Sequence, residues 1–314
     1  MKVIQIASTA GDACGVGNFA LNLQNALQAV GVEVRTVREF PSKAAAADCI
    51  LVQYGWNMFD DKTVADFCAR SSLPVFMFAH HHGVEQFEPA VRGFLTVARG
   101  IISPTSAPVL DLKHPGWAPE ALSDRILLKR RFGLPDSPVV GSSGFLMLSK
   151  EYPEVLRRLL PFAREEGFFV ELATSRWFKG SDEVLAELAE LRDVFPESFR
   201  FGDDYLDQAE LNLRLQACDL LWCWTRTKSS PYGSGSISDQ YGSGSRIVAP
   251  DKLQFRHVLE LANTVTCEAD IDDLVASIVR QVRLGRFERH DPHSVSWDEA
   301  AKAIEDFVAG ALTA

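Results

Sequence analysis

Short apolar runs alternate with longer stretches of helical periodicity along the whole chain. Residues 3–7 and 49–53 are two such runs, and the stretch 16–30 between them carries Phe19 and Leu23 on one apolar stripe. Short runs that are apolar at nearly every position are typical of strands buried on both faces. Strands that alternate with helices predict parallel β/α units, and therefore an α/β fold.

The alternation stops once and then restarts. Residues 114–119 hold two prolines and a glycine, which continue neither a helix nor a strand. We therefore expect two doubly wound, Rossmann-like halves, with domains at 1–125 and 126–295 and a closing helix at 296–314 that packs back on the first domain. The expected strands are 3–7, 32–37, 49–53, 75–79, 100–103, 139–143, 168–173, 199–201, 220–224, 246–249 and 264–267. The expected helices are 16–30, 62–70, 86–98, 151–165, 183–194, 208–217, 253–261, 272–284 and 297–312.

Composition excludes several classes of protein. The 314 residues carry a net charge of −10, and neither half is basic, which argues against nucleic-acid binding. No apolar stretch approaches the length of a membrane span or a signal-peptide core, and no Lys/Arg-rich amphipathic helix indicates peripheral membrane contact. The six cysteines form no CxxC pair and are expected to be buried thiols in a reducing compartment. We expect a cytoplasmic protein.

A glycine-rich turn follows the first expected strand and opens the first helix. Gly15 and Gly17 lie in it, and backbone amides at such a helix start favour a phosphate. The dinucleotide fingerprint is not met, because Phe19 and Ala20 follow, which argues against a nicotinamide-dependent oxidoreductase. A tight turn with no ligand is the alternative.

A second cluster of small residues precedes another expected helix. Ser234, Gly235 and Ser236 supply free amides and hydroxyls suited to a diphosphate, and Asp239 lies one turn into the helix, where it can accept from ribose hydroxyls. A flexible surface loop is the alternative.

Two further side chains stand at the ends of expected strands. Lys150 follows the strand 139–143, at the sheet edge where ligands bind, and its charge would balance a phosphate. His80 is the first of three adjacent histidines after the strand 75–79. The side chains of three successive extended residues diverge, so we do not expect a metal site there. We do expect one of the histidines to serve as a hydrogen-bond donor or a base. A solvated lysine and structural histidines are the alternatives.

Several segments, in order, resemble the family 4 retaining glycosyltransferases. Residues 15–23 (GVGNFALNL) are similar to the family's GGIGRYxxxL opening, and residues 50–54 (ILVQY) to its VHIQYE strand. Residues 74–80 resemble PVVxTxH, 130–135 the RxxLGLP lead-in to the second domain, and 144–150 the GFLxxxK segment. Residues 296–301 (SWDEAA) resemble the SWEEVA start of the closing helix.

The resemblance implies a GT-B fold, in which two Rossmann-like domains face each other across a cleft. It implies transfer of a sugar from a UDP- or GDP-linked donor to a hydroxyl of a saccharide or other small acceptor, with retention and with no metal or other cofactor. Gly15 and Gly17 would lie near the donor phosphate, Lys150 would contact the diphosphate, and His80 would lie near the transferred hexose.

The chain departs from the family pattern at two places. The Glu-x7-Glu motif is replaced by Pro231 and Asp239, and Ser234–Ser236 fits a variant that carries an SGS loop instead. The usual arginine of the lysine segment is Phe145, so Arg226 and Lys228 are candidates for the missing charge. Pro231 cannot replace a carboxylate, which leaves open a non-catalytic GT-B subunit that binds nucleotide sugars. A GT-B nucleotide-sugar epimerase is a second alternative.

Overall fold

The computed structural model describes residues 1–9, 15–41, 46–55, 58–80, 83–97, 102, 105–116, 118–119, 121–176, 181–227 and 234–313. Its contacts divide the chain into two units, each with its own core. The first contains Met1–Pro115 and Ser296–Ala314, and the second contains Gly116–Ser230 and Ser234–Val295.

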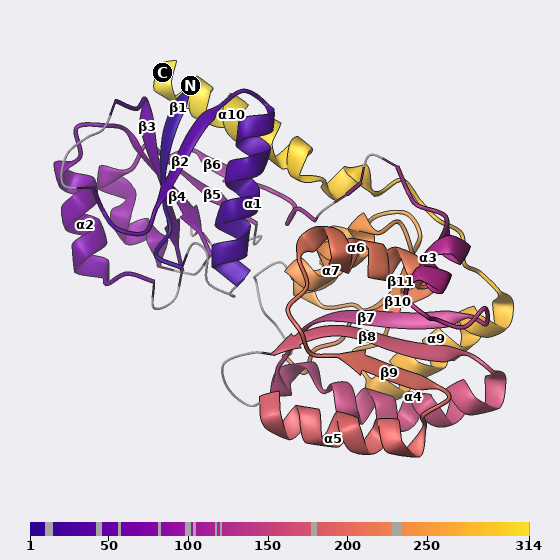
Figure 1. The fold of residues 1–314 in the computed structure, drawn as a ribbon. Helices are drawn as coiled ribbons and strands as arrows, with labels where there is room; N and C mark the ends of the chain where they lie inside the picture. The colour runs from indigo at the N-terminus through magenta and orange to yellow at the C-terminus, as the bar shows by residue number, and fades with distance from the viewer. Residues whose placement is uncertain are drawn as a thin grey trace. The chain divides into compact units, whose positions relative to one another are not determined.

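The first unit is built on a parallel six-stranded sheet in the order β2-β1-β3-β4-β5-β6 (Figure 1). Its strands are β1 Lys2–Ile6, β2 Glu33–Val37, β3 Cys49–Tyr54, β4 Val75–Ala79, β5 Gly93–Thr96 and β6 Val109–Asp111. Its helices are α1 Gly15–Ala29, α2 Asp61–Arg70, the 3-10 helix η1 Val84–Ala90 and α10 Trp297–Thr313.

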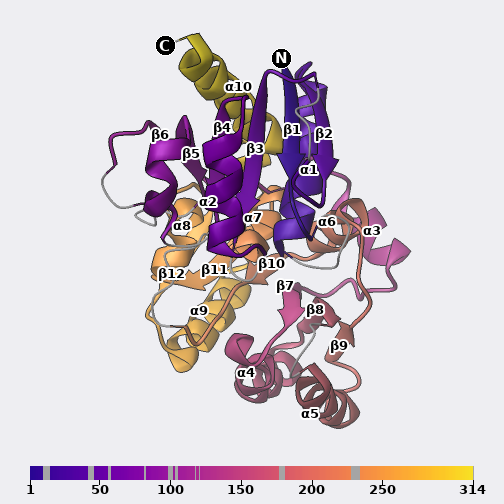
Figure 2. The ribbon, with the colours of Figure 1, turned by 90° about the vertical axis from the view of Figure 1, so that its left-hand side faces the viewer.

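Helices cover both faces of this sheet. Phe19 and Leu23 of α1 pack with Trp297 and Ile304 of α10 on one face. On the other face, α2 and η1 pack, with Val64 of α2 in that core, and α2 lies toward the viewer in Figure 2. Since alternate residues of the strands face the two helical layers, the strands are apolar at almost every position.

The second unit repeats this architecture with the strand order β12-β11-β10-β7-β8-β9, again all parallel. Its strands are β7 Val139–Leu146, β8 Phe169–Arg176, β9 Phe199–Gly202, β10 Leu220–Trp222, β11 Arg246–Pro250 and β12 Thr264–Cys267. Its helices are α3 Arg125–Arg131, α4 Tyr152–Glu166, α5 Ser181–Val194, α6 Gln208–Ala217, α7 Gly235–Gly242, α8 Arg256–Leu259 and α9 Ile271–Leu284, with 3-10 helices η2 Leu148–Lys150, η3 Leu253–Phe255 and η4 Pro292–Val295. The helices α4, α5 and α9 cover one face, and α3, α6, α7 and α8 cover the other. The expected α/β class with two doubly wound halves is confirmed.

Local expectations failed in two segments, and a third segment is not tested. The helix expected at 86–98 is instead η1 followed by β5, because Pro89 removes a helical hydrogen bond and Gly93 begins a short buried strand. The strand expected at 100–103 lies almost wholly outside the described residues, and the sixth strand of the sheet is β6. The helix expected at 253–261 is split into η3 and the single turn α8.

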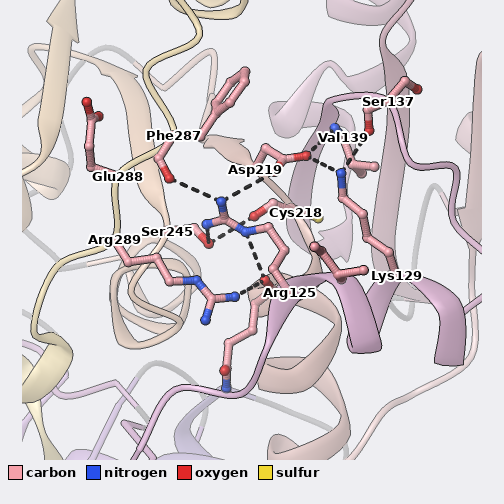
Figure 3. Close-up of polar contacts among 12 residues, drawn as sticks. Arg125, Lys129, Ser137, Val139, Cys218, Asp219, Ser245, Phe287, Glu288 and Arg289 are labelled. Carbon is pink, nitrogen blue, oxygen red and sulfur yellow. Dashed lines mark hydrogen bonds and ion pairs between the residues drawn. The ribbon is translucent and has the colours of Figure 1, made fainter.

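Buried charges fasten the amino ends of β7 and β10 (Figure 3). Asp219 precedes β10; its Oδ2 lies 2.6 Å from Nζ of Lys129 and accepts a hydrogen bond from the backbone N–H of Val139 at 2.7 Å. Its Oδ1 lies 3.3 Å from Nη1 of Arg125. Lys129 and Arg125 both come from α3, so one carboxylate joins α3 to two strands of the sheet. Ligands bind at the opposite, carboxyl edge of such sheets, so this cluster is structural.

Arg289 lies near Arg125 of this cluster. Its Nη2 donates to the backbone oxygen of Gln216 at 2.8 Å, and its Nη1 donates to that of Ser123. Burial, together with the neighbouring charge of Arg125, lowers the pKa of Arg289 to about 10. The guanidinium therefore remains charged at neutral pH and holds two loops to the end of α6.

Candidate functional site

Each sheet has one position where the strand order reverses. In the first unit it lies between β1 and β3, and in the second between β7 and β10. Crossover helices leave to opposite sides there, so the loops at the carboxyl ends of the two strands diverge and leave room for a ligand. The loops that follow β1, β3, β7 and β10 are therefore the candidate binding segments.

Lys150 and Arg226 belong to the two loops at the reversal point of the second unit. Lys150 ends η2, directly after β7, and Arg226 follows β10. The loops are fastened together, since the N–H of Arg226 donates to the backbone oxygen of Ser149 at 2.6 Å and the hydroxyl of Thr225 donates to the same oxygen at 3.1 Å. Two cations that are distant in sequence thus come to one end of the sheet.

The two cations differ in their surroundings. The Lys150 side chain is half-buried, and among the described residues its Nζ has no hydrogen-bond or ion-pair partner. The Arg226 side chain is 68% exposed, and its Nη1 lies 3.7 Å from Oε1 of Glu151. An anion bound beside Lys150 would supply the partner that no described residue provides.

The amino end of α7 lies against the end of β7. Ser234 is the N-cap residue, and Gly235 and Ser236 form the first turn, in which the N–H groups have no intrahelical partner. The hydroxyl of Ser236 approaches Gly144 so closely that a Cβ there would lie 2.7 Å from its oxygen. The N–H of Ser234 donates to the backbone oxygen of Gln254 at 3.0 Å, so Gly235 and Ser236 supply the helix-start amides. These amides and the lysine loop border the same strand, as a phosphate-binding site requires.

Asp239 lies in α7, one turn from its start, as expected. Its Oδ1 accepts a hydrogen bond from Nε2 of Gln208 in α6 at 3.0 Å. Gly116 approaches the same turn, where a Cβ would lie 3.0 Å from the backbone nitrogen of Asp239. The carboxylate is half-buried and oriented by a neighbouring helix.

Glu151, Trp224 and Lys252 lie beside this site but were not predicted from the sequence as site residues. Glu151 has a left-handed backbone, with φ 46°, and its Oε2 accepts from the indole N–H of Trp224 at 3.0 Å. Lys252 is buried, its Nζ lies 4.2 Å from the ring centre of Trp224, and it donates to the backbone oxygen of Thr225. Lys252 follows β11 as Lys150 follows β7, so the same signal, a cation after a parallel strand, would have found it.

The first unit places its expected residues at the corresponding edge. Gly15 begins α1 and is exposed, with no atom within 4 Å of an added Cβ, and Gly17 is buried in the first turn. His80 follows β4 and is half-buried. Its ring stacks on Phe78, with centroids 5.0 Å apart, and meets the edge of Phe19 of α1 at 5.0 Å. The structure therefore brings the α1 start and His80 together through Phe19.

Burial lowers the pKa of His80 to about 3, with a further contribution from His114 nearby. Burial also lowers the pKa of His114 to about 4. The His80 imidazole is therefore neutral at pH 7, and a general base with so low a pKa is weak. This property favours a hydrogen-bonding role over proton abstraction.

Two buried glutamines in the first sheet were also missed as a pair. Gln5 of β1 and Gln53 of β3 are both 0% exposed, and Nε2 of Gln53 donates to Oε1 of Gln5 at 2.9 Å. Oε1 of Gln53 lies 2.7 Å from Nε2 of His80. Their sequence signal is an amide inside an otherwise apolar strand, a position that requires a partner.

Some expected residues lie outside the described part of the chain. These are the residues 11–14 of the glycine-rich turn, His81, His82, Lys228 and Pro231. The position of the missing family glutamate is thus carried by sequence alone.

Aspartates cap two helices of the fold. Asp270 is the N-cap of α9 and accepts from the N–H groups of Asp272 and Asp273, and Asp60 caps α2. Ser296 accepts from the N–H of Glu299 at the start of α10. The cysteines that the structure describes are unpaired and buried, namely Cys49, Cys68, Cys218, Cys223 and Cys267. Over the described segments, every helix is too short or too polar to cross a bilayer.

No known family profile matches the sequence, and no curated protein matches it. Solved structures do match, over the full length. Sucrose-phosphate synthase from Thermosynechococcus elongatus is 12% identical with a TM-score of 0.71, covering 99% of this chain and 98% of the other. HepE of Anabaena, in complex with UDP and glucose, is 14% identical with a TM-score of 0.62 and covers 100% and 99%. A UDP-forming trehalose-phosphate synthase from Burkholderia xenovorans is 10% identical with a TM-score of 0.62 and covers 95% and 78%. The chain shares the GT-B fold of these glycosyltransferases.

Proposed function

We propose that this GT-B chain is a glycosyltransferase that moves a sugar from a nucleotide-linked donor to a hydroxyl of a saccharide or other small acceptor. The observation that carries the proposal is the strand-order reversal between β7 and β10, where Lys150 and Arg226 lie on loops joined at Ser149. Ser234 caps α7, and Gly235 and Ser236 add helix-start amides beside β7. This combination suits the diphosphate of a nucleotide sugar.

The proposed chemistry is electrostatic. Departure of the nucleoside diphosphate develops negative charge on its distal phosphate, and Lys150, Arg226 and the α7 amides would stabilise that charge in the transition state. We propose that these groups suffice without a metal ion and that the sugar is transferred with retention. His80, neutral and fixed among aromatic rings, would contact a hydroxyl.

We propose that the nucleobase of the sugar donor is uracil, with guanine as the alternative. HepE is solved in complex with UDP and glucose, and the Burkholderia protein is described as UDP-forming. In this chain the carboxyl ends of β8 and β9 are joined, since Nε of Arg176 donates to Asp203 at 2.7 Å and the hydroxyl of Thr174 donates to the backbone oxygen of Gly202 at 2.6 Å. These strand ends are the proposed base-binding segments.

Release of nucleoside diphosphate from a panel of UDP- and GDP-sugars, with and without EDTA, tests the proposal. We expect turnover with one donor to continue in EDTA. Calorimetric binding of UDP should weaken about ten- to hundred-fold in Lys150→Ala, the loss of one charged hydrogen bond. Arg192→Ala, which removes an exposed cation of α5, is the matched control and should bind normally.

The same experiment separates the second candidate function. The replacement of a family glutamate by Pro231 favours a non-catalytic subunit that binds nucleotide sugars. Binding of UDP by the wild type, without release of nucleoside diphosphate from any donor, would establish that function. Neither binding nor turnover would contradict both, and unchanged affinity in Lys150→Ala would contradict the site.

A further inference from the structure

A chain of side-chain amides crosses the first sheet and ends on His80. Thr36, Gln5, Gln53 and His80 stand on or directly after β2, β1, β3 and β4, which are consecutive neighbours in the sheet. Gln5 donates to the hydroxyl of Thr36 at 2.8 Å, Gln53 donates to Gln5, and the oxygen of Gln53 meets Nε2 of His80. The two glutamines are fully buried, so water cannot substitute for these partners.

The donor-to-acceptor direction of these side-chain hydrogen bonds is set at one end by a backbone carbonyl. Nε2 of Gln5 lies 2.7 Å from the carbonyl oxygen of Ala20 in α1, and a carbonyl only accepts. The Gln5 amide therefore points its NH₂ group toward α1 and its oxygen toward Gln53. That oxygen also only accepts, so Gln53 must present its NH₂ group to Gln5 and its own oxygen to His80.

The same logic fixes the proton on the imidazole. The oxygen of Gln53 lies 2.7 Å from Nε2 of His80 and only accepts, so Nε2 must carry the hydrogen. A neutral imidazole with Nε2–H has a lone pair on Nδ1. Among the described residues, Nδ1 of His80 has no hydrogen-bond partner, and the ring is half-buried between Phe19 and Phe78.

We propose that Gln5 and Gln53 are positioning residues that hold His80 as the Nε2–H tautomer, so that its Nδ1 accepts a hydrogen bond from a hydroxyl of the substrate. The recognition of a substrate hydroxyl rests on the proposed glycosyl transfer, whereas the tautomer does not. The low pKa of His80 agrees with a ring that stays neutral. A hydroxyl donor is thereby selected over a group that only accepts.

The tautomer is measured directly by long-range ¹H–¹⁵N correlation on protein labelled with ¹⁵N-histidine. The seven histidines give few signals, and His80→Asn identifies the one that matters. We expect a single neutral Nε2–H form for His80 from pH 6 to pH 8, without nucleotide. A protonated Nδ1 or a mixture of tautomers in the wild type would overturn the proposal.

Two variants of Gln53 test the hydrogen-bond relay, which is the series Gln5, Gln53 and His80. They distinguish an effect of its hydrogen bonds from an effect of packing. Gln53→Leu removes the acceptor, so the His80 signal should become a mixture of tautomers. Gln53→Glu keeps the shape, loses the donor to Gln5 and places a carboxylate against Nε2, which should raise the pKa of His80. Gln5→Leu, which leaves Gln53 in place but frees its amide to rotate, should also yield a mixture. An unchanged His80 signal in Gln53→Leu or Gln5→Leu would contradict the relay.

Substrate analogues test the acceptor role by binding alone. Deoxy and deoxyfluoro versions of the donor sugar are compared at each hydroxyl position, because fluorine cannot donate. At one position, both analogues should bind wild type about ten-fold more weakly than the parent sugar. In Gln53→Glu, assayed below the raised pKa of His80 so that Nδ1 carries a proton, the fluoro analogue should regain affinity over the deoxy analogue. If the tautomer is as expected but all analogues bind equally, the substrate contact is refuted. If no nucleotide sugar binds at all, the proposed function fails while the relay stands.

Discussion

At the scale of single residues, Gly144 shows how closely the lysine strand and α7 approach. Its φ of 131° is disfavoured for any side chain, and an added Cβ would meet the hydroxyl oxygen of Ser236 at 2.7 Å. Gly144→Ala should therefore lower the free energy of unfolding by about 2–4 kcal/mol, from backbone strain and overpacking together. Gly285→Ala, at a left-handed helix end with open space around it, is the control and should cost about 1 kcal/mol. Urea denaturation measures both, and equal losses would contradict the contact.

The histidines of the first unit predict a pH dependence of stability. The pKa of His80 is lowered to about 3 and that of His114 to about 4, both below the ordinary value of 6.5. As the pH falls below 6.5, the unfolded chain takes up protons first, so the free energy of unfolding decreases until the folded pKa values are reached. Each histidine contributes at most about 1.4 kcal/mol per pH unit, less where water reaches the ring.

Urea denaturation between pH 7 and pH 4.5 checks this dependence. His114→Asn should flatten the slope, because one of the two groups no longer titrates. His293→Asn replaces an exposed histidine and should leave the slope as in wild type. A slope unaffected by His114→Asn would show that other groups cause the acid sensitivity.

At the scale of elements, the buried carboxylate of Asp219 decides how firmly α3 is joined to the second sheet. Asp219→Asn would leave Lys129, 7% exposed, and Arg125, 15% exposed, without their counter-charge. Breaking a buried pair in this way costs about 3–5 kcal/mol, which chemical denaturation would detect as a lower midpoint. Asp251→Asn breaks an exposed pair with Arg256 and should leave the midpoint almost unchanged. Similar shifts in the two variants would contradict the structural role of the cluster.

The elements also show where sequence reasoning succeeds and where it stops. The strand expected at 264–267 is found as Thr264–Cys267, because a short run rich in β-branched residues and bounded by polar residues needs no tertiary information. The edge strand β6, with only three partly exposed residues, has no such run and was missed. Lys150 was predictable because its position depends on one strand end. The hydrogen bond between Gln5 and Gln53 was not predictable, because it depends on the register of two strands whose paired glutamines are 48 residues apart.

At the scale of the whole molecule, the division into two units predicts where a nucleotide should act. Lys150, Arg226 and Ser234–Ser236 all belong to the second unit, whereas His80 belongs to the first. UDP alone, which lacks the transferred sugar, should therefore slow hydrogen exchange in residues 144–151 and 234–238 and leave residues 76–80 unchanged. At a concentration 100 times the Kd, bound UDP stabilises a two-state unit by about 2.7 kcal/mol, enough to slow exchange through global unfolding about 100-fold. Exchange measured by mass spectrometry, with Lys150→Ala as the comparison, tests this assignment. Protection confined to the first unit would reverse it, because the diphosphate would then bind at the glycine turn of α1 instead of at the lysine loop.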